Sequence, residues 1–198
     1  MIMLRRLLPV LLLTLLTAAC AIVVTPPAPT PTPGPAPTPV QPAAGTGATP
    51  AAHGTVNVYV TFYGGPDNDP PGSTDIAYPN GRHGSAGGVG SYADPITLAT
   101  DPRELPPGTL VYAPQWQKYF VMEDDCEECI DEWGADHHPH VDLWTGATGS
   151  KLLACENTLT PDDPVALEIN PPSDRPVDLR PLYDPATNTC WAPAQASP

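Results

Sequence analysis

The sequence predicts a small all-β barrel. Short segments rich in β-branched and aromatic residues alternate with turns rich in glycine and proline, which is typical of an all-β fold rather than an α/β fold. No amphipathic helical stretch of ordinary length is present. Ten of the 30 prolines lie between Pro26 and Pro50. Roughly 140 residues therefore remain for a globular unit, which is enough for one domain with a core.

Strands are expected where apolar residues alternate or run together between turn signals. The first expected strand ends at a loop of glycine, proline and aspartate, and glycine-rich segments follow it. Helix is expected only in short pieces, such as residues 101–105 or 130–133. The expected strands are residues 56–63, 96–99, 109–113, 118–122 and 140–144, with weaker signals at 165–169 and 177–179.

The N-terminus predicts export. Arg5 and Arg6 precede an apolar run, and residues 16–20, Leu-Thr-Ala-Ala-Cys, are similar to a bacterial lipobox. We therefore expect a signal peptide at residues 1–20, with lipidation at Cys20. An uncleaved anchor and ordinary cleaved secretion are the alternatives, because the apolar run continues to Val24. All three place the remaining chain outside the cytoplasm, and the first makes it a membrane-anchored lipoprotein.

The composition divides the chain into four parts. A Pro/Thr-rich linker, disordered and partly extended as polyproline II, is expected at residues 21–54. The barrel is expected at residues 55–191 and a short tail at residues 192–198. A linker of this kind holds a domain at a distance from a membrane, or it is a passive spacer.

The charge of the chain excludes two classes of partner. The formal net charge is -14, and every Asp and Glu lies at or after Asp67. Nucleic acid and anionic membrane surfaces need clustered Lys and Arg, so the membrane is expected to be met only through the N-terminal anchor. An acidic chain is compatible with a neutral or cationic partner or with a metal ion. Alternatively, its negative charge serves only to keep the protein soluble.

The cysteines predict two disulfides. Four remain after Cys20, which suits an exported domain and allows three pairings. A bridge between Cys126 and Cys129 closes a very short loop, so we expect each of them to reach Cys155 or Cys190. The Cys126-x-x-Cys129 motif with His137, His138 and His140 also suits zinc, but export favours disulfides. No metal and no cofactor are expected, and Glu127, Glu128, Asp131 and Glu132 are expected to form a solvated acidic loop.

Four motifs, in order, resemble the group of expansins, rare lipoprotein A and family 45 endoglucanases. They are Val-Thr-Phe-Tyr-Gly at residues 60–64, Leu-Pro-Pro-Gly-Thr-Leu-Val-Tyr at 105–112, the strand ending at Asp124 before Cys-x-x-Cys, and His-Val-Asp-Leu at 140–143. Residues 141–146 also resemble the last motif of the three-aspartate domain of lytic transglycosylases, and small secreted expansin-like proteins are the nearest likeness. The resemblance implies a six-stranded double-psi β-barrel. Gly64 stands where family 45 enzymes carry an aspartate.

Asp142 and Asp124 are the candidate catalytic residues. Asp142 lies between two apolar residues of an alternating strand, so its carboxyl points to the face opposite theirs. In a groove it would be a general acid with a raised pKa; elsewhere it would hold a loop through backbone N–H groups. Asp124 rather than Asp125 is favoured as its assistant by the resemblance. The candidate substrate-binding residues are Tyr63, Asp67, Asp69, His140 and Trp144.

These features predict an exported monomer that binds or remodels cell-wall polysaccharide, either peptidoglycan or β-glucan. As an enzyme it would be a glycoside hydrolase or a lytic transglycosylase. The alternatives are a non-catalytic expansin-like glycan-binding protein and a barwin-like protease inhibitor.

Overall fold

The computed structural model describes residues 53–192. The expected signal peptide, the lipidation site Cys20, nearly all of the linker and most of the tail lie outside the described residues.

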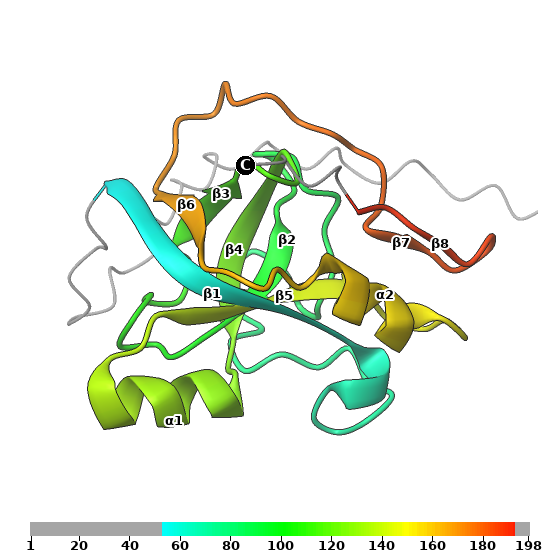
Figure 1. Ribbon diagram of the computed structural model, residues 1–198, viewed down its shortest axis with the longest axis horizontal. Helices are drawn as coiled ribbons and strands as arrows, with labels where there is room; N and C mark the ends of the chain where they lie inside the picture. The colour runs from blue at the N-terminus through cyan, green and yellow to red at the C-terminus, as the bar shows by residue number, and fades with distance from the viewer. Residues whose placement is uncertain (1–52, 193–198) are drawn as a thin grey trace, which may run out of the picture. The chain divides into compact units, whose positions relative to one another are not determined.

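Six strands form a closed barrel, which confirms the predicted fold class (Figure 1). Around the barrel the strands follow one another in the order β1-β5-β2-β4-β3-β6. Each of the five strong strand signals and the weaker one at 165–169 corresponds to a barrel strand. The bounds are Gly54–Gly64 for β1, Ile96–Ala99 for β2, Leu110–Ala113 for β3, Lys118–Asp124 for β4, His140–Gly146 for β5 and Val165–Ile169 for β6.

The barrel consists of two equivalent halves. Exchanging β1 with β4, β2 with β5 and β3 with β6 reproduces the same cyclic order. The exchange also turns the parallel pair β1–β5 into the other parallel pair, β2–β4. The two halves therefore interlock, with β2 and β5 side by side at the centre, as a double-psi barrel requires.

The core follows from residue alternation on β1 and β5, whereas β4 is buried on both faces. On β1, Val58, Val60 and Phe62 face inward, and on β5, Val141 and Leu143 do so. All seven residues of β4 are buried, because other segments cover its outward face, where Tyr119 donates to the Pro172 carbonyl and Glu123 accepts from the His83 N–H.

Two short helices pack against the barrel. Helix α1, Glu127–Asp136, is longer than the predicted piece at 130–133, because the Cys126 sulfur caps it by accepting from the Cys129 N–H. Helix α2, Leu152–Leu159, was not predicted, although Leu152, Cys155 and Leu159 give it a buried stripe at helical spacing. No helix in residues 53–192 is long and apolar enough to cross a membrane.

The C-terminal segment crosses the barrel without adding a strand to it (Figure 1). The predicted strand at 177–179 and helical piece at 101–105 are wrong, since neither is regular secondary structure. Lys118 is fully buried and donates to the carbonyls of Asp178 and Arg180 at 2.5 and 2.6 Å, which holds this segment in place. A hairpin of β7, Tyr183–Asp184, and β8, Thr189–Cys190, follows it.

The two predicted disulfides are present, but the predicted pairing is wrong. Cys126 joins Cys129, and Cys155 joins Cys190. The first bridge spans the start of α1, where the first helical turn brings the two Cα atoms to 5.2 Å, within the range that a disulfide needs. The second fastens α2 to β8 across a sequence separation of 35.

Replacing Cys155 and Cys190 by serine is expected to lower the free energy of unfolding by about 4 kcal/mol, because that bridge closes the longer loop in the unfolded chain. Replacing Cys126 and Cys129 by serine is expected to lower it by about 2 kcal/mol. Denaturant unfolding of both variants measures this order, and a larger loss from the Cys126/Cys129 variant would contradict it.

Candidate active site

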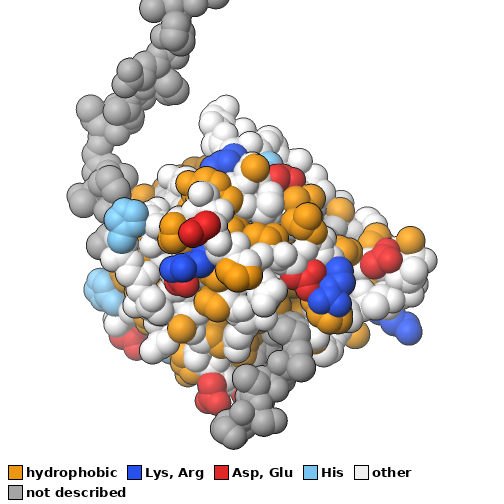
Figure 2. Space-filling model, turned by 90° about the horizontal axis from the view of Figure 1, so that it is seen from above, with side chains coloured by type: hydrophobic (Ala, Val, Ile, Leu, Met, Phe, Trp, Pro, Cys, Tyr) orange, Lys and Arg blue, Asp and Glu red, His pale blue; other side chains and the backbone are white. Residues whose placement is uncertain are grey.

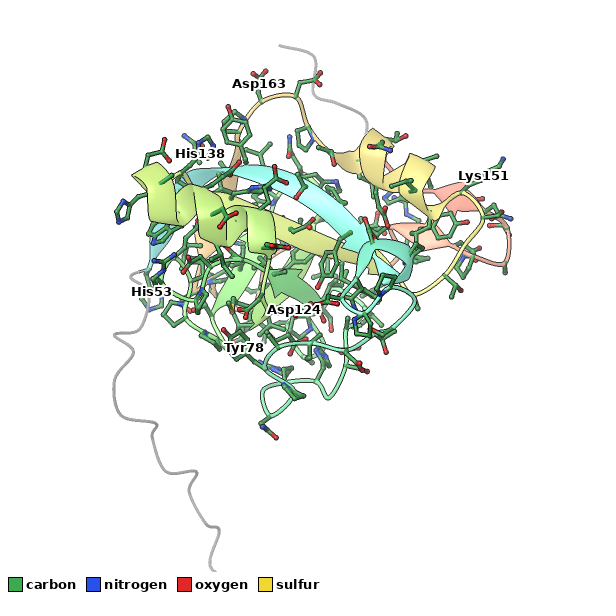
Figure 3. The ribbon with its side chains drawn as sticks, turned by 90° about the horizontal axis from the view of Figure 1, so that it is seen from below. His53, Tyr78, Asp124, His138, Lys151 and Asp163 are labelled. Atoms are coloured by element: carbon green, nitrogen blue, oxygen red, sulfur yellow. A yellow bond between two sulfur atoms is a disulfide. The ribbon has the colours of Figure 1, made fainter. Side chains whose placement is uncertain are left out.

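A cleft of about 710 Å³ opens at one end of the barrel, beside the start of α1. Figure 3 views the molecule from this side, with Asp124 and Tyr78 labelled near the cleft. Of the predicted site residues, five line it together: Tyr63, Asp67, Asp69, Asp124 and Asp142. The other lining residues are Asn68, Asp75, Ile76, Ala77, Ala99, Asp125, Cys126, Glu127, Glu128 and Ile130.

Three neighbouring strands bring the two candidate catalytic aspartates together. Ala99 on β2 is the register partner of both Asp142 on β5 and Asp124 on β4. Adjacent strands lie about 4.8 Å apart, so the backbones of the two aspartates flank Ala99 at about 10 Å from each other. A register shift between Leu98 and Ala99 gives β4 an extra residue. Such a bulge changes the direction of the following side chain, which turns Asp124 out of the core.

Asp142 has the environment of a proton donor. Burial raises the pKa of its carboxyl to about 7, and the negative charges of Asp67 and Glu128 act in the same direction. The nearby Thr61 hydroxyl opposes this shift. The Asp142 Oδ1 atom is buried and has no hydrogen-bond partner. Asp142 therefore presents to the cleft a carboxyl that is half-protonated near neutral pH and has one unpaired oxygen.

His140 lies behind Asp142 rather than on the wall of the cleft. Its ring is buried, with Nε2 at 2.9 Å from the Thr61 hydroxyl and Nδ1 at 2.9 Å from a carboxylate oxygen of Glu132. Thr61 is the register partner of Asp142 on the adjacent strand. His140 thus fixes the side chain next to Asp142 and does not itself line the cleft.

Asp124 is held by three donors. Its Oδ2 accepts from the Tyr63 hydroxyl at 2.8 Å, and its Oδ1 accepts from the N–H groups of Ala77 and Asp125 at 2.9 and 3.0 Å. Burial raises the pKa of Asp124, and these donors oppose the increase. Burial and the adjacent Asp124 charge raise the pKa of Tyr63 well above its ordinary value. Asp124 therefore positions Tyr63 at the cleft, and both of its carboxyl oxygens already accept hydrogen bonds.

The remaining predicted binding residues lie in different places. Asp67 closes the 3₁₀ turn Gly65–Asp67 by accepting from the Gly64 N–H at 2.8 Å, and Asp69 is exposed at the rim. Trp144 is buried against the edge of Tyr63 with ring centroids 5.2 Å apart. It lines a separate, largely apolar pocket of about 330 Å³ with Val89 and Leu179. The structure therefore separates Trp144 from the aspartates.

Glu156 on α2 is a buried carboxyl that was not among the predicted site residues. It is only 3% exposed, its Oε1 has no hydrogen-bond partner, and burial raises its pKa to about 7, with further contributions from Asp67 and Asp142. Its Oε1 lies where a side chain on residue 64 would begin, 2.6 Å from an ideal Cβ on Gly64. Glycine at position 64 therefore accommodates the Glu156 carboxyl. The buried stripe of α2 would have revealed Glu156, had this helix been predicted.

The acidic segment after Asp124 is a helix rather than the expected loop. Glu127 and Glu128 occupy the first turn of α1, where the helix dipole favours negative charge, and both line the cleft. Within residues 53–192, no group of three or more His, Cys, Asp or Glu side chains has an arrangement that could hold a metal ion.

Comparison with known proteins identifies a family. The family model described as the DDB_G0273701 N-terminal domain matches residues 55–191. The chain belongs to this family. It is similar to the Dictyostelium discoideum protein named "Uncharacterized protein DDB_G0273701/DDB_G0273221", with 43% identity over 133 residues, or 66% of this chain and 58% of the relative. The chain thus spans less than two thirds of that relative's length, and no solved structure matches it.

Replacing Asp142 by asparagine is expected to stabilise the fold above neutral pH. Between the ordinary pKa of aspartate, about 3.9, and a pKa of about 7, the folded protein keeps a proton that the unfolded chain has lost. The free energy of unfolding therefore falls as the pH rises through this range, and asparagine removes the loss. The variant and the wild type should be equally stable at about pH 4, and the variant more stable at about pH 8 by as much as about 4 kcal/mol.

Urea unfolding at both pH values measures this difference. Asp163→Asn is the matched control, since Asp163 is an exposed acid on the loop after α2, away from Asp124 in Figure 3. An Asp142→Asn protein that is no more stable than the control at about pH 8 would refute the assignment of a buried, unpaired carboxyl.

Glu156→Gln is expected to behave in the same way, because the Glu156 carboxyl is also buried with an unpaired oxygen. The free energy of unfolding of this variant should exceed that of the wild type above about pH 7, and by less or not at all at about pH 4. If the two proteins respond identically to pH, Glu156 does not titrate near neutrality.

Proposed function

We propose that the chain acts on cell-wall polysaccharide in this cleft, with Asp142 as the proton donor. The proposal depends chiefly on one observation: the Asp142 carboxyl faces a cleft large enough for sugar rings and has a buried, unpaired Oδ1 atom. A general acid works best when its pKa lies near the working pH. The raised pKa of Asp142, about 7, meets this condition.

The chemistry requires one proton transfer at the glycosidic oxygen. In hydrolysis, Asp142 would donate its proton to the leaving oxygen as the bond of that oxygen to the anomeric carbon breaks. A water molecule would form the new bond to this carbon, and the proton that it releases to solvent would restore the acid form of Asp142. The negative charge of an ionised Asp124 would stabilise the positive charge that develops on the sugar.

A route with one acid fits the cleft equally well. Among its lining carboxyls, Asp124 is fully engaged by donors, whereas Asp142 has a free oxygen. In lytic transglycosylation, Asp142 would become ionised when it donates its proton to the leaving oxygen. It would then take a proton from a hydroxyl of the same sugar, and the oxygen of this hydroxyl would attack the anomeric carbon and form an anhydro ring. No second free carboxyl is then needed.

Several features support work outside the cytoplasm on a cell wall. The N-terminal apolar run with Cys20 and the Pro/Thr-rich segment suit an exported, tethered domain, and two disulfides suit an oxidising compartment. The resemblance to expansins, rare lipoprotein A and family 45 endoglucanases in residues 60–64 and 140–143 favours a glycan ligand. The same cleft without cleavage would give an expansin-like binding protein.

Incubation of the protein with peptidoglycan, chitin and β-glucans, followed by mass spectrometry, tests the proposal. New reducing ends would indicate hydrolysis and anhydro ends would indicate transglycosylation. Asp142→Asn is expected to lower either activity by at least about 100-fold, because general acid catalysis contributes about 10²–10⁴, whereas Asp163→Asn should leave it unchanged.

Binding without products would favour the non-catalytic alternative. Undiminished cleavage by Asp142→Asn would rule out Asp142 as the acid. A protein that neither binds nor cleaves any of these glycans would leave the protease-inhibitor alternative, which does not depend on Asp142.

A further inference from the structure

The cleft has an unusually one-sided charge. Eight of its fifteen lining residues are acidic, and none is Lys, Arg or His. Six of the acids come from two loops and the first turn of α1, namely Asp67, Asp69, Asp75, Asp125, Glu127 and Glu128. Like charges around a concave surface concentrate the field there and raise the local concentration of cations.

None of the six Lys and Arg side chains of residues 53–192 lines the cleft, although Arg103 donates to the carbonyl of the lining residue Ile130. Arg103, Arg175 and Arg180 form ion pairs with Asp101, Glu168 and Asp178, respectively, and none of these residues lines the cleft. Lys118 is buried against backbone carbonyls. Figure 2 shows the opposite face, where basic side chains lie beside acidic ones. The acids that line the cleft therefore have no basic side chain among the lining residues to neutralise their field.

A second observation distinguishes this cleft from an ordinary acidic surface. The Asp142 Oδ1 atom is buried at its wall and accepts no hydrogen bond. An unpaired buried oxygen normally costs stability, so its presence among the residues that line the cleft points to a donor supplied by a ligand.

We infer that the cleft selects an amino-sugar polymer with free ammonium groups, a de-N-acetylated glucosamine chain. This inference rests on the proposed function and names its substrate class. Ammonium groups on the sugar are attracted electrostatically to the cleft acids, whereas acetylated or neutral sugars can form only hydrogen bonds there. Uronic acids and phosphorylated glycans are repelled because they are negatively charged. Tyr63, Ile76 and Ile130 add apolar surface that suits the C–H faces of sugar rings.

Calorimetric titration of the full chain with two matched hexamers tests this preference. At about pH 5.5 and low salt, where ordinary carboxyls are ionised, the hexamer of glucosamine is expected to bind at least about tenfold more tightly than the hexamer of N-acetylglucosamine. Raising the salt to about 0.3 M should reduce the ratio, because exposed charges are screened.

Two variants of equal charge serve as the comparison. Asp69→Asn with Asp75→Asn removes two exposed cleft acids whose side chains make no hydrogen bond within residues 53–192. Asp162→Asn with Asp163→Asn removes two exposed acids from the loop after α2. The first pair should reduce the preference for the glucosamine hexamer several-fold, and the second pair should leave this preference unchanged. This comparison distinguishes the effect of the local field in the cleft from the effect of the net charge of the protein.

Each outcome decides the question. Equal binding of the two hexamers, or an equal loss in both double variants, would overturn the charge selection while leaving a glycan function intact. Failure to bind any glycan would overturn the proposed function itself. Tighter binding of an oligolysine of matched charge, or calcium binding that blocks the glucosamine hexamer and disappears in Asp69→Asn/Asp75→Asn, would show that the cleft serves a basic peptide or a cation instead.

Discussion

The placement of β5 between β1 and β2 is the constraint on which the site depends. It sets Asp142 between Thr61 and Ala99, and because Ala99 also pairs with Asp124, the same register fixes the second aspartate. A slip of one residue would bury Asp142 in the barrel and expose Val141 or Leu143. The apolar residues that fill the core therefore also determine which carboxyl faces the cleft.

This arrangement is energetically unfavourable for the carboxyls themselves. Asp142 and Glu156 both have raised pKa values, about 7, through burial, and each leaves one oxygen unpaired. The described residues contain few other such defects, the indole nitrogen of Trp116 being the remaining one. The barrel core and the Cys155–Cys190 bridge, which ties α2 and so Glu156 to the C-terminal hairpin, provide the stability that offsets them. Local destabilisation that the surroundings maintain is characteristic of functional sites.

The sequence predicted the barrel well because strand signals are local. Alternation at residues 56–63 and 140–144 and the short apolar run at 96–99 each identify a strand without knowledge of its partner. It also predicted which way Asp142 points, since a period of two fixes the face.

The features that the sequence did not predict depend on tertiary contacts. Helix α2 is only eight residues long, too short for its stripe to stand out, so Glu156 was overlooked. The short loop between Cys126 and Cys129 argues against a bridge between them. The helical turn that brings the two residues together is not evident from the sequence.

The acidic segment after Asp124 shows why charge is hard to interpret from sequence. A run of Asp and Glu is usually a solvated surface, and no local pattern distinguishes that from the wall of a cleft. Here Cys126 starts a helix directly after β4, so the first turn of α1 meets the loop that follows β1 at the cleft. Glu127 and Glu128 thereby join Asp67 and Asp69, residues about sixty positions earlier in the chain. Glu132, one turn further along α1, instead reaches His140 behind Asp142. Helix α1 thus supplies negative charge to the cleft and also holds His140 behind Asp142. The position of this helix, rather than its acidic composition, relates it to the proposed function.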